Sequence, residues 1–597
     1  MNIPKNTPSE RLAAFRALYQ NAKDRFSEQT AAFDRHMAQY RGSTEIDGSD
    51  EPASTVRNIT YEIVESQISS QIPLPKVDAE QYSEKRDRNA KAIERLCAAV
   101  RDKLPFEEMN DLDERYTYIY GGSVWFVEWD SAEGEDGGVR VHCLSPKNLI
   151  PQPGICRVED MDYCFLRFTT TKCDLVRRYG VKEEDLPLAD IEEDETADLA
   201  DGEIATVVLC FYRGDDRAVG QFVFSGDLIL LDLPDTYRRK AMRCKTCGEP
   251  LNACRCGHTK PILGDETEET VRRSVRQTPT GAEEVFFGKD TPVPDGEKTA
   301  LRDFRVPYYT PKRFPIVVRR NTSGENMLFG QSDCEFLRPE QQAINKIESR
   351  ILQKLLRAGV TPVMPEDATV SLNNSVFGQV IKMKPGDSAA QYGKVDTTPD
   401  ISQDIAEAER LYLHAKRTLG ISDAYQGIGD NRAESGYARQ LQISQASGRL
   451  ESKKKMKYTA YADIDRLIFE YYLAYSDEPR TLSYRDAYGR IHNASFNRYD
   501  FLAYDEKDET YRYDDAYLFS VDLNGGAEGQ RAELWQKNLE NLRSGALGDT
   551  GSPVTLLRYW QCQERAHYPF ARENVEYFTD AVERMKRPDA KGDESDL

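Results

Sequence analysis

The chain has 597 residues, of which 39% are hydrophobic and 30% charged, and these values predict a soluble globular protein of roughly four modules and exclude a disordered chain. The first residues lack an apolar signal core, and no stretch approaches the ~18 uninterrupted apolar residues that span a bilayer, so we expect a cytoplasmic or intravirion protein without membrane contact. The formal charge of -21 argues against a surface that grips nucleic acid tightly.

The first half of the chain is expected to be α+β. Apolar residues recur at helical spacing over residues 9–41 and again over residues 56–68, before Pro73 and Pro75 stop the second helix. The pattern then changes to strands between about residues 116 and 233. The expected strands are 123–129, 139–143, 164–168 and 206–212.

Two polar stretches interrupt this half, an acidic one at residues 183–203 and a charged one at residues 264–298. Neither carries enough apolar surface to offset the entropy of ordering. We expect both to be exposed insertions or linkers.

A helix is expected from about Phe336 to Ala358, with Gly359 as its terminator. Four cations recur along it at spacings of four, four and three, which places them on one face. On its own, such a line is typical of a solvated helix face. The four cations are Lys346, Arg350, Lys354 and Arg357.

The next segment, residues 360–400, is rich in proline and glycine around a strand-like run at 377–384, so we expect a compact β excursion. A second helix follows from Ile401 to Leu419, and Gly420 ends it.

A glycine-bearing polar loop at residues 425–436 leads into a nearly unbroken helical pattern over 437–475. Such a helix would be on the order of 50 to 60 Å long, the scale of a strut rather than of a small core element. Strand-like segments follow over 480–523, and a final helical region ends in the polar tail 590–597.

Four cysteines form a Cys-x2-Cys pair, a six-residue spacer and a Cys-x-Cys pair. Zinc favours four tetrahedral sulfur ligands, and four protein ligands leave no open position for water, so the pattern predicts a structural Zn²⁺ site. His258 is an alternative ligand to the last cysteine. Disulfides or free thiols are the other interpretation, which needs oxidising conditions or four unrelated buried thiols. The expected ligands are Cys244, Cys247, Cys254 and Cys256.

The order helix, β excursion, helix, loop and long helix resembles the portal proteins of tailed bacteriophages, most closely those of phages of Gram-positive hosts. The likeness covers nearly the whole chain, but its motifs are helix lengths and glycine positions rather than a catalytic signature. The stretches that carry it are residues 58–75, Gly330-Gln331-Ser332-Asp333, Gln426-Gly427-Ile428-Gly429 and Ser435-Gly436-Tyr437-Ala438.

The resemblance implies an α+β portal fold with a wing, two stem helices, a β-rich clip, a tunnel loop with a long helix, and a helical C-terminal crown. The expected boundaries are 1–333 for the wing, with the zinc-binding insertion at about 240–262, 334–359 for the first stem helix, 360–400 for the clip, 401–420 for the second stem helix, 421–436 for the tunnel loop, 437–524 for the long helix and the return to the wing, and 525–597 for the crown and tail.

It also implies a non-enzymatic ring, expected to be a dodecamer, at one capsid vertex, through which double-stranded DNA is packaged and ejected without sequence readout. The partners would be the terminase large subunit, the head-tail adaptor, and the major capsid and scaffold proteins. The protein would belong to the virion and, during assembly, to the host cytoplasm. An acidic chain suits this role, because channel walls that bind DNA only weakly let a duplex slide.

In the family, tunnel loops approach DNA most closely, so the resemblance makes Asn431 and Arg432 candidates for backbone contact. Lys382 and Lys384 in the clip are weaker candidates. The four cations of the first stem helix would point at DNA phosphates or pair with acids of the neighbouring subunit's stem, and both options stay open.

Two other classes of function stay open as alternatives. The sequence has no phosphate-binding loop, because residues 281–289 have the wrong spacing, and it lacks the usual hydrolase and metalloprotease motifs. Isolated carboxylates are abundant enough to build a two-metal nuclease, which would make the chain a zinc-ribbon DNA-processing enzyme. A non-ring scaffold or adaptor protein would explain the long helices and the acidity.

Overall fold

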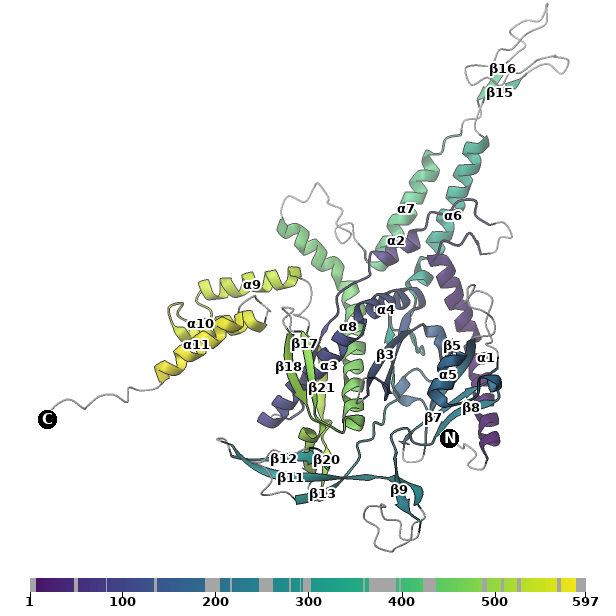
Figure 1. The fold of residues 1–597 in the computed structure, drawn as a ribbon. Coiled ribbons are helices and arrows are strands. Elements are labelled where there is room, and N and C mark those ends of the chain that lie inside the picture. The colour runs from purple at the N-terminus through teal and green to yellow at the C-terminus, as the bar shows by residue number, and fades with distance from the viewer. Residues whose placement is uncertain are drawn as a thin grey trace, which may run out of the picture.

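The structure is a computed structural model. It describes residues 7–47, 52–81, 83–133, 137–187, 204–214, 217–245, 261–278, 281–289, 291, 293, 302–357, 360–363, 393–396, 399–421, 436–485, 491–505, 509–522, 528–565, 568 and 571–586. Within these residues the chain is a mixed α+β protein with eleven α-helices and several small antiparallel sheets (Figure 1). None of the described helices combines the length and apolar character needed to cross a bilayer.

The largest sheet has five antiparallel strands in the order β4-β5-β6-β7-β8, and α1 packs against it. The apolar stripe expected on the N-terminal helix makes this contact: Phe15 is fully buried, and its ring stacks on Phe222 with a centroid distance of 4.4 Å. The elements are α1 (Pro8–Tyr40), β4 (Leu149–Pro151), β5 (Tyr163–Thr171), α5 (Lys172–Tyr179), β6 (Ile204–Arg213), β7 (Val219–Ser225) and β8 (Leu228–Leu233).

The main core lies around a three-stranded sheet, β14-β2-β3, which is packed against α4 and the long helix α8. Fully buried Trp125 of β2 is in ring contact with Phe106 of α4 and with Tyr461 of α8, at centroid distances of 5.6 and 5.5 Å. The elements are α3 (Glu84–Lys103), α4 (Phe106–Tyr120), β2 (Gly122–Asp130), β3 (Gly138–Leu144), β14 (Ile316–Arg320) and α8 (Gly436–Tyr475).

The polar stretch 264–298 was expected to be an exposed insertion or linker, but much of its described part is folded into strands. Its described residues supply β11 and β12 of the sheet β12-β11-β13, where Val271 and Phe286 are buried. The prediction was wrong because a few apolar side chains face the core while distant residues pair with the charges. The strands of this part of the chain are β9 (Arg239–Cys244), β10 (Pro261–Glu266), β11 (Glu268–Thr278), β12 (Gly281–Gly288) and β13 (Arg302–Pro307).

A helical hairpin projects from the body (Figure 1). Helices α6 and α7 lie side by side, α2 packs at their base, and the described strands β15 and β16 pair antiparallel at the tip. Leu337 and Ile344 of α6 and Ala415 of α7 are buried in the contact with α2. The elements are α2 (Ile59–Glu65), α6 (Asp333–Arg357), β15 (Val360–Val363), β16 (Gly393–Asp396) and α7 (Ser402–Leu419).

After α8 the chain returns to the body, where β21 pairs antiparallel with β1 from the first hundred residues. The last three helices form a separate group on the side of the body away from α1 (Figure 1). The elements are β1 (Leu74–Ala79), β17 (Arg480–Arg485), β18 (Ile491–Phe496), β19 (Leu502–Asp505), β20 (Thr510–Tyr513), β21 (Tyr517–Asp522), α9 (Glu528–Arg543), α10 (Pro553–Arg565) and α11 (Ala571–Lys586).

Candidate functional site

The helical hairpin α6/α7 is held in antiparallel register by polar pairs. His414 Nδ1 of α7 lies 2.8 Å from Glu340 Oε1 of α6, and nearer the tip Arg350 Nη2 lies 2.7 Å from Asp404 Oδ1. Lys354 also pairs with Asp404. Two of the four cations predicted on one face of α6 therefore bind an acid of the same chain.

Asp404 is almost completely enclosed, with its side chain 7% exposed, whereas the Arg350 side chain is 60% exposed. The hydrogen bond from Lys354 holds the pKa of Asp404 below its usual value, and the charges of Lys354 and Arg350 act in the same direction against the effect of burial. Lys346 is exposed, and the side chain of Arg357 lies outside the described part.

The segment that enters α6 is fixed by a close backbone crossing. Gly121 ends α4 with a positive φ of 90°, and a Cβ at this position would lie 2.1 Å from the carbonyl oxygen of Gly330. The two backbone segments touch here because neither glycine has a side chain. Ser332 Oγ donates a hydrogen bond to the carbonyl of Ile119, which places Asp333 at the first position of α6.

Asp333 is fully buried at the base of the hairpin and accepts hydrogen bonds from three side chains. Lys453 Nζ of α8 lies 2.7 Å from both carboxylate oxygens. Gln67 Nε2 donates over 2.9 Å and Asn321 Nδ2 over 2.8 Å. A buried carboxylate needs this number of partners, because burial removes its hydration. The first residue of α6 is thereby tied to the long helix.

One turn further along α8, Lys457 joins a second buried group of charges. Its Nζ lies 3.0 Å from Glu114 Oε1, and Arg319 of β14 reaches the same carboxylate oxygen at 2.8 Å and also pairs with Asp113. Burial alone would raise the pKa of Glu114, but the charges of Arg319 and Lys457 outweigh it and hold the pKa below its usual value. The long helix is thus also tied to α4.

The sequence of α8 contains a dense run of positive charge, Lys453-Lys454-Lys455-Met456-Lys457. Lys453 and Lys457 point into the protein, and Lys454 and Lys455 are exposed. The spacing of four separates the two roles, because residues four apart share one face of a helix.

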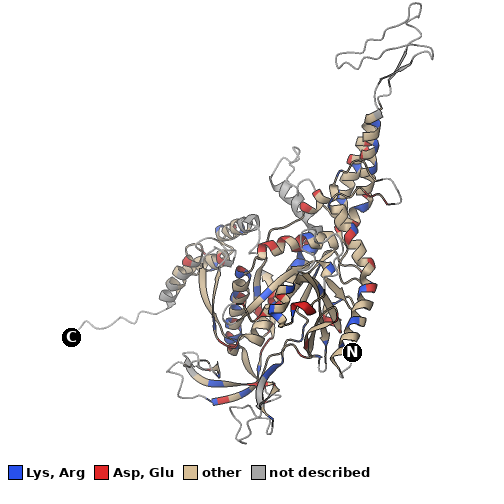
Figure 2. Cartoon of the chain, turned by 45° about the vertical axis from the view of Figure 1, so that its right-hand side comes forward, with Lys and Arg blue, Asp and Glu red and all other residues tan. Residues whose placement is uncertain are grey.

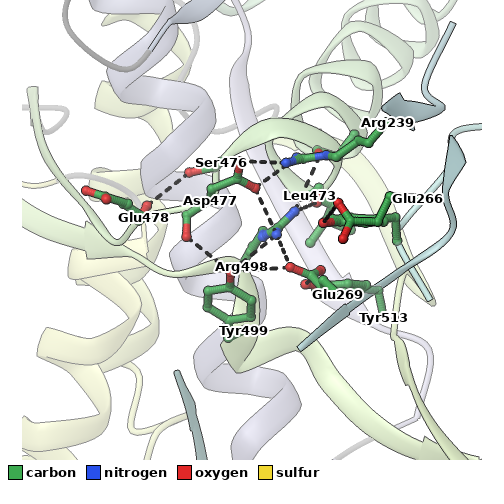
Figure 3. Close-up of polar contacts among 12 residues, drawn as sticks. Arg239, Glu266, Glu269, Leu473, Ser476, Asp477, Glu478, Arg498, Tyr499 and Tyr513 are labelled. Atoms are coloured by element: carbon green, nitrogen blue, oxygen red, sulfur yellow. Dashed lines mark hydrogen bonds and ion pairs between the residues drawn. The ribbon is translucent and has the colours of Figure 1, made fainter. Parts of the chain in front are cut away.

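The C-terminal end of α8 is held by two arginines (Figure 3). Arg239 donates to both oxygens of Asp477, at 2.6 and 2.8 Å, and to the carbonyl of Ala474 at 2.7 Å. Arg498 lies 2.9 Å from the same aspartate and also pairs with Glu269 of β11. Cations near the last carbonyls stabilise a helix end. Through this cluster the sheet β12-β11-β13 is attached to the end of α8.

Of the predicted zinc ligands, Cys244 is described, and it is buried at the end of β9. Cys247, Cys254, Cys256 and the alternative ligand His258 lie outside the described residues. Cys244 faces Pro261 in the antiparallel pair β9/β10, so the segment that carries the other cysteines starts and ends at adjacent positions. Sulfur donors of this kind suit Zn²⁺. The described residues by themselves contain no group of three potential metal ligands.

The predicted DNA-contacting residues Asn431, Arg432, Lys382 and Lys384 also lie outside the described part. Figure 2 shows acidic and basic residues interspersed over the body and the hairpin, where they are described. Comparison of the chain with the models of known protein families and with curated protein sequences gives no match.

Proposed function

We propose that this chain is the subunit of a portal-type ring at a capsid vertex, through which double-stranded DNA is packaged and ejected. One observation carries the proposal: α6 and α7 form a hairpin that leaves the body, pairs β15 with β16 at its tip and is followed by the long helix α8. This order and the adjacency of the two helices are what the resemblance to portal proteins requires.

The hairpin carries apolar side chains that its own partner helix does not cover. Leu356 of α6 is 76% exposed, and Ile405 and Leu413 of α7 are 46% and 42% exposed. Apolar surface exposed on a projecting element is typical of a protein interface. Contact between α6 of one copy and α7 of the next would be heterologous, and such contacts close into a ring when the rotation between copies allows it.

The charges of the hairpin suit a channel wall along which a duplex slides. The C-terminal half of α6 carries Lys346 and Arg350, and the first half of α7 carries Asp404, Glu407 and Glu409. Most of this charge is already paired within the chain: Arg350 with Asp404, Glu407 with Arg410 and Glu409 with Arg57. This pairing lowers the positive charge available to a duplex. A channel wall with few free cations would let DNA slide, as the acidic composition also suggests.

In this proposal the ring is a dodecamer that serves as a docking site, and it performs no catalysis. The tip of the hairpin would meet the terminase large subunit and later the head-tail adaptor, and the body would meet the capsid and scaffold proteins. The segments that contain Asn431 and Arg432 would approach the duplex. The zinc ion would hold the cysteine loop closed and would have no part in chemistry.

Native mass spectrometry and negative-stain microscopy of the purified full chain test the proposal. We expect closed rings with a central hole. Leu413→Lys places a charge in the expected contact and should shift the mass distribution towards monomers. A monomer at all protein concentrations, or rings without a hole, would contradict the proposal.

Ile491→Lys is the matched control for this variant. Ile491 is 70% exposed on β18, away from the hairpin, so this change has the same chemistry without touching the expected contact. Rings of Ile491→Lys should be as abundant as those of the original protein. Equal loss of rings in both variants would show that the hairpin is not the contact.

A further inference from the structure

A cavity of about 470 Å³ lies between α8 and the strand β14. One face of α8 forms one wall, and Phe314 and Ile316 with the neighbouring residues form another. This volume falls within the range of small-molecule sites, about 300 to 1,000 Å³. The ring proposed above assigns no role to this space.

Four arginines line the cavity, and they come from three parts of the chain. They are Arg157, which precedes a short 3₁₀ turn, Arg213 at the end of β6, Arg313 ahead of β14 and Arg320 at its end. The acidic residues of the lining are Glu159 and Asp463. The lining therefore has an excess of positive charge in a chain whose net charge is -21.

Two of these arginines are held by backbone carbonyls. Arg213 donates to the carbonyl of Lys312, and its guanidinium lies 4.2 Å from the centre of the Phe314 ring. Arg320 donates to the carbonyl of Leu328 at 2.9 Å and to that of Cys156. A carbonyl fixes the direction of a guanidinium without cancelling its charge, so both cations are oriented and remain charged.

The other two arginines lie near acids, but at distances longer than those of a strong ion pair. Arg313 Nε lies 3.7 Å from Glu470 Oε1, and Arg157 Nε lies 3.5 Å from Glu159 Oε2. Charge-assisted hydrogen bonds between arginine and carboxylate are usually about 2.7 to 2.9 Å long. Both side chains are also substantially exposed, so they can turn towards a ligand.

We propose that this cavity binds a small phosphomonoester with a flat or aliphatic body of about nucleotide size. A phosphomonoester carries a charge of about -1.5 to -2 at neutral pH and offers the oxygen geometry that guanidinium groups prefer. The body of the ligand would lie against the apolar part of the lining, on Val158, Phe314 and Leu467. This inference does not depend on the ring.

Isothermal titration calorimetry of the full chain with adenosine monophosphate tests the proposal, with adenosine as the ligand that lacks the phosphate. We expect saturable binding of the monophosphate, no binding of adenosine and competition by inorganic phosphate. Arg313→Gln should weaken binding by roughly tenfold, the loss of one charge-assisted hydrogen bond. Equal binding of adenosine, or no binding of the monophosphate at millimolar concentration, would overturn the proposal.

Two further variants separate a site from general charge attraction. Glu159→Gln removes one of the two lining acids and should tighten binding several-fold. Arg177→Gln removes an arginine that is 83% exposed on α5, outside the cavity, and should leave the affinity unchanged. The proposal is overturned if Arg177→Gln weakens binding as much as Arg313→Gln, or if Glu159→Gln weakens it.

Discussion

Two aspartates of this chain bind cations in very different surroundings. Asp404, near the outer end of the two hairpin helices, pairs with Arg350 and Lys354, whose side chains are 60% and 35% exposed. Asp333, at the base of the hairpin, binds Lys453, whose side chain is only 10% exposed. In both cases a carboxylate binds a cation. What differs is the access of water to that cation.

This difference decides how firmly each pair holds its elements. An exposed ion pair contributes little, because water and salt compete for both charges. Breaking a buried pair leaves one charge without hydration or a partner, which is strongly destabilising. We therefore expect the base of α6 to move together with α8, whereas the outer part of the hairpin can adjust its contacts.

Lys453→Met tests the buried side of this comparison and should have the largest effect. The change leaves Asp333 buried with only the neutral donors Gln67 and Asn321 among the described side chains that bind it. We expect the free energy of unfolding to fall by about 3 to 5 kcal/mol. Urea denaturation followed by tryptophan fluorescence measures this loss.

Lys454→Met is the matched control, since Lys454 is the exposed neighbour on the same helix. It should change the free energy of unfolding by less than about 0.5 kcal/mol. Adding Asp333→Asn to Lys453→Met should recover part of the loss, because it removes the unpaired charge. A Lys453→Met protein as stable as the control would disprove the importance of this pair.

Glu470 of α8 sharpens the comparison, because it is a buried acid whose neighbouring cations lie farther away than a charge-assisted hydrogen bond allows. Its side chain is 8% exposed, Arg313 and Arg466 lie 3.7 and 3.9 Å away, and Oε2 accepts no hydrogen bond from the described residues. Burial raises the pKa of Glu470 from 4.5 to about 7. Between these values the folded protein binds a proton that the unfolded chain releases, so stability falls as the pH rises through this window.

Glu470→Gln removes this titration. At pH values above the folded pKa the variant should be more stable than the original protein by roughly 2 kcal/mol, and near the unfolded pKa the two should be equally stable. Thermal unfolding across this pH range measures the difference. A variant whose stability differs from that of the original protein by the same amount at every pH would contradict the expectation.

Local patterns were sufficient to predict the hairpin helix α7 and the long helix α8. The expected helices 401–419 and 437–475 are observed as Ser402–Leu419 and Gly436–Tyr475, and Gly420 ends the first in the left-handed conformation with φ of 76°. Apolar spacing and a terminal glycine are properties of neighbouring residues, so the sequence displays them directly.

The ion pairs could not be predicted in this way, because their partners are distant in the chain. The sequence shows that the four cations of α6 share one helix face. It does not show their partner, because Asp404 lies 50 residues after Lys354. Glu269 binds Arg498 across 229 residues, and without that partner β11 reads as a polar linker. The one available signal was the spacing of four between Lys453 and Lys457, which places both on one face of α8.

Asp404→Asn tests the exposed side of the comparison and should have the smallest effect. Lys354 and Arg350 lower the pKa of Asp404, so its contribution to stability is present above the unfolded pKa of 3.8 and is lost as the pH falls below it. At neutral pH and low salt we expect a loss of stability smaller than that of either variant above.

Salt distinguishes this loss from that of the buried pair. Thermal unfolding of Asp404→Asn and of the original protein should converge at high salt, because ions screen the exposed cations, whereas the defect of Lys453→Met should persist. Glu407→Gln, which removes an acid paired with Arg410 on the outer face of α7, is the control for a change of charge alone. If the defect of Asp404→Asn were as large as that of Lys453→Met and insensitive to salt, the hairpin would be held as rigidly as its base, and the distinction between the two regions would be wrong.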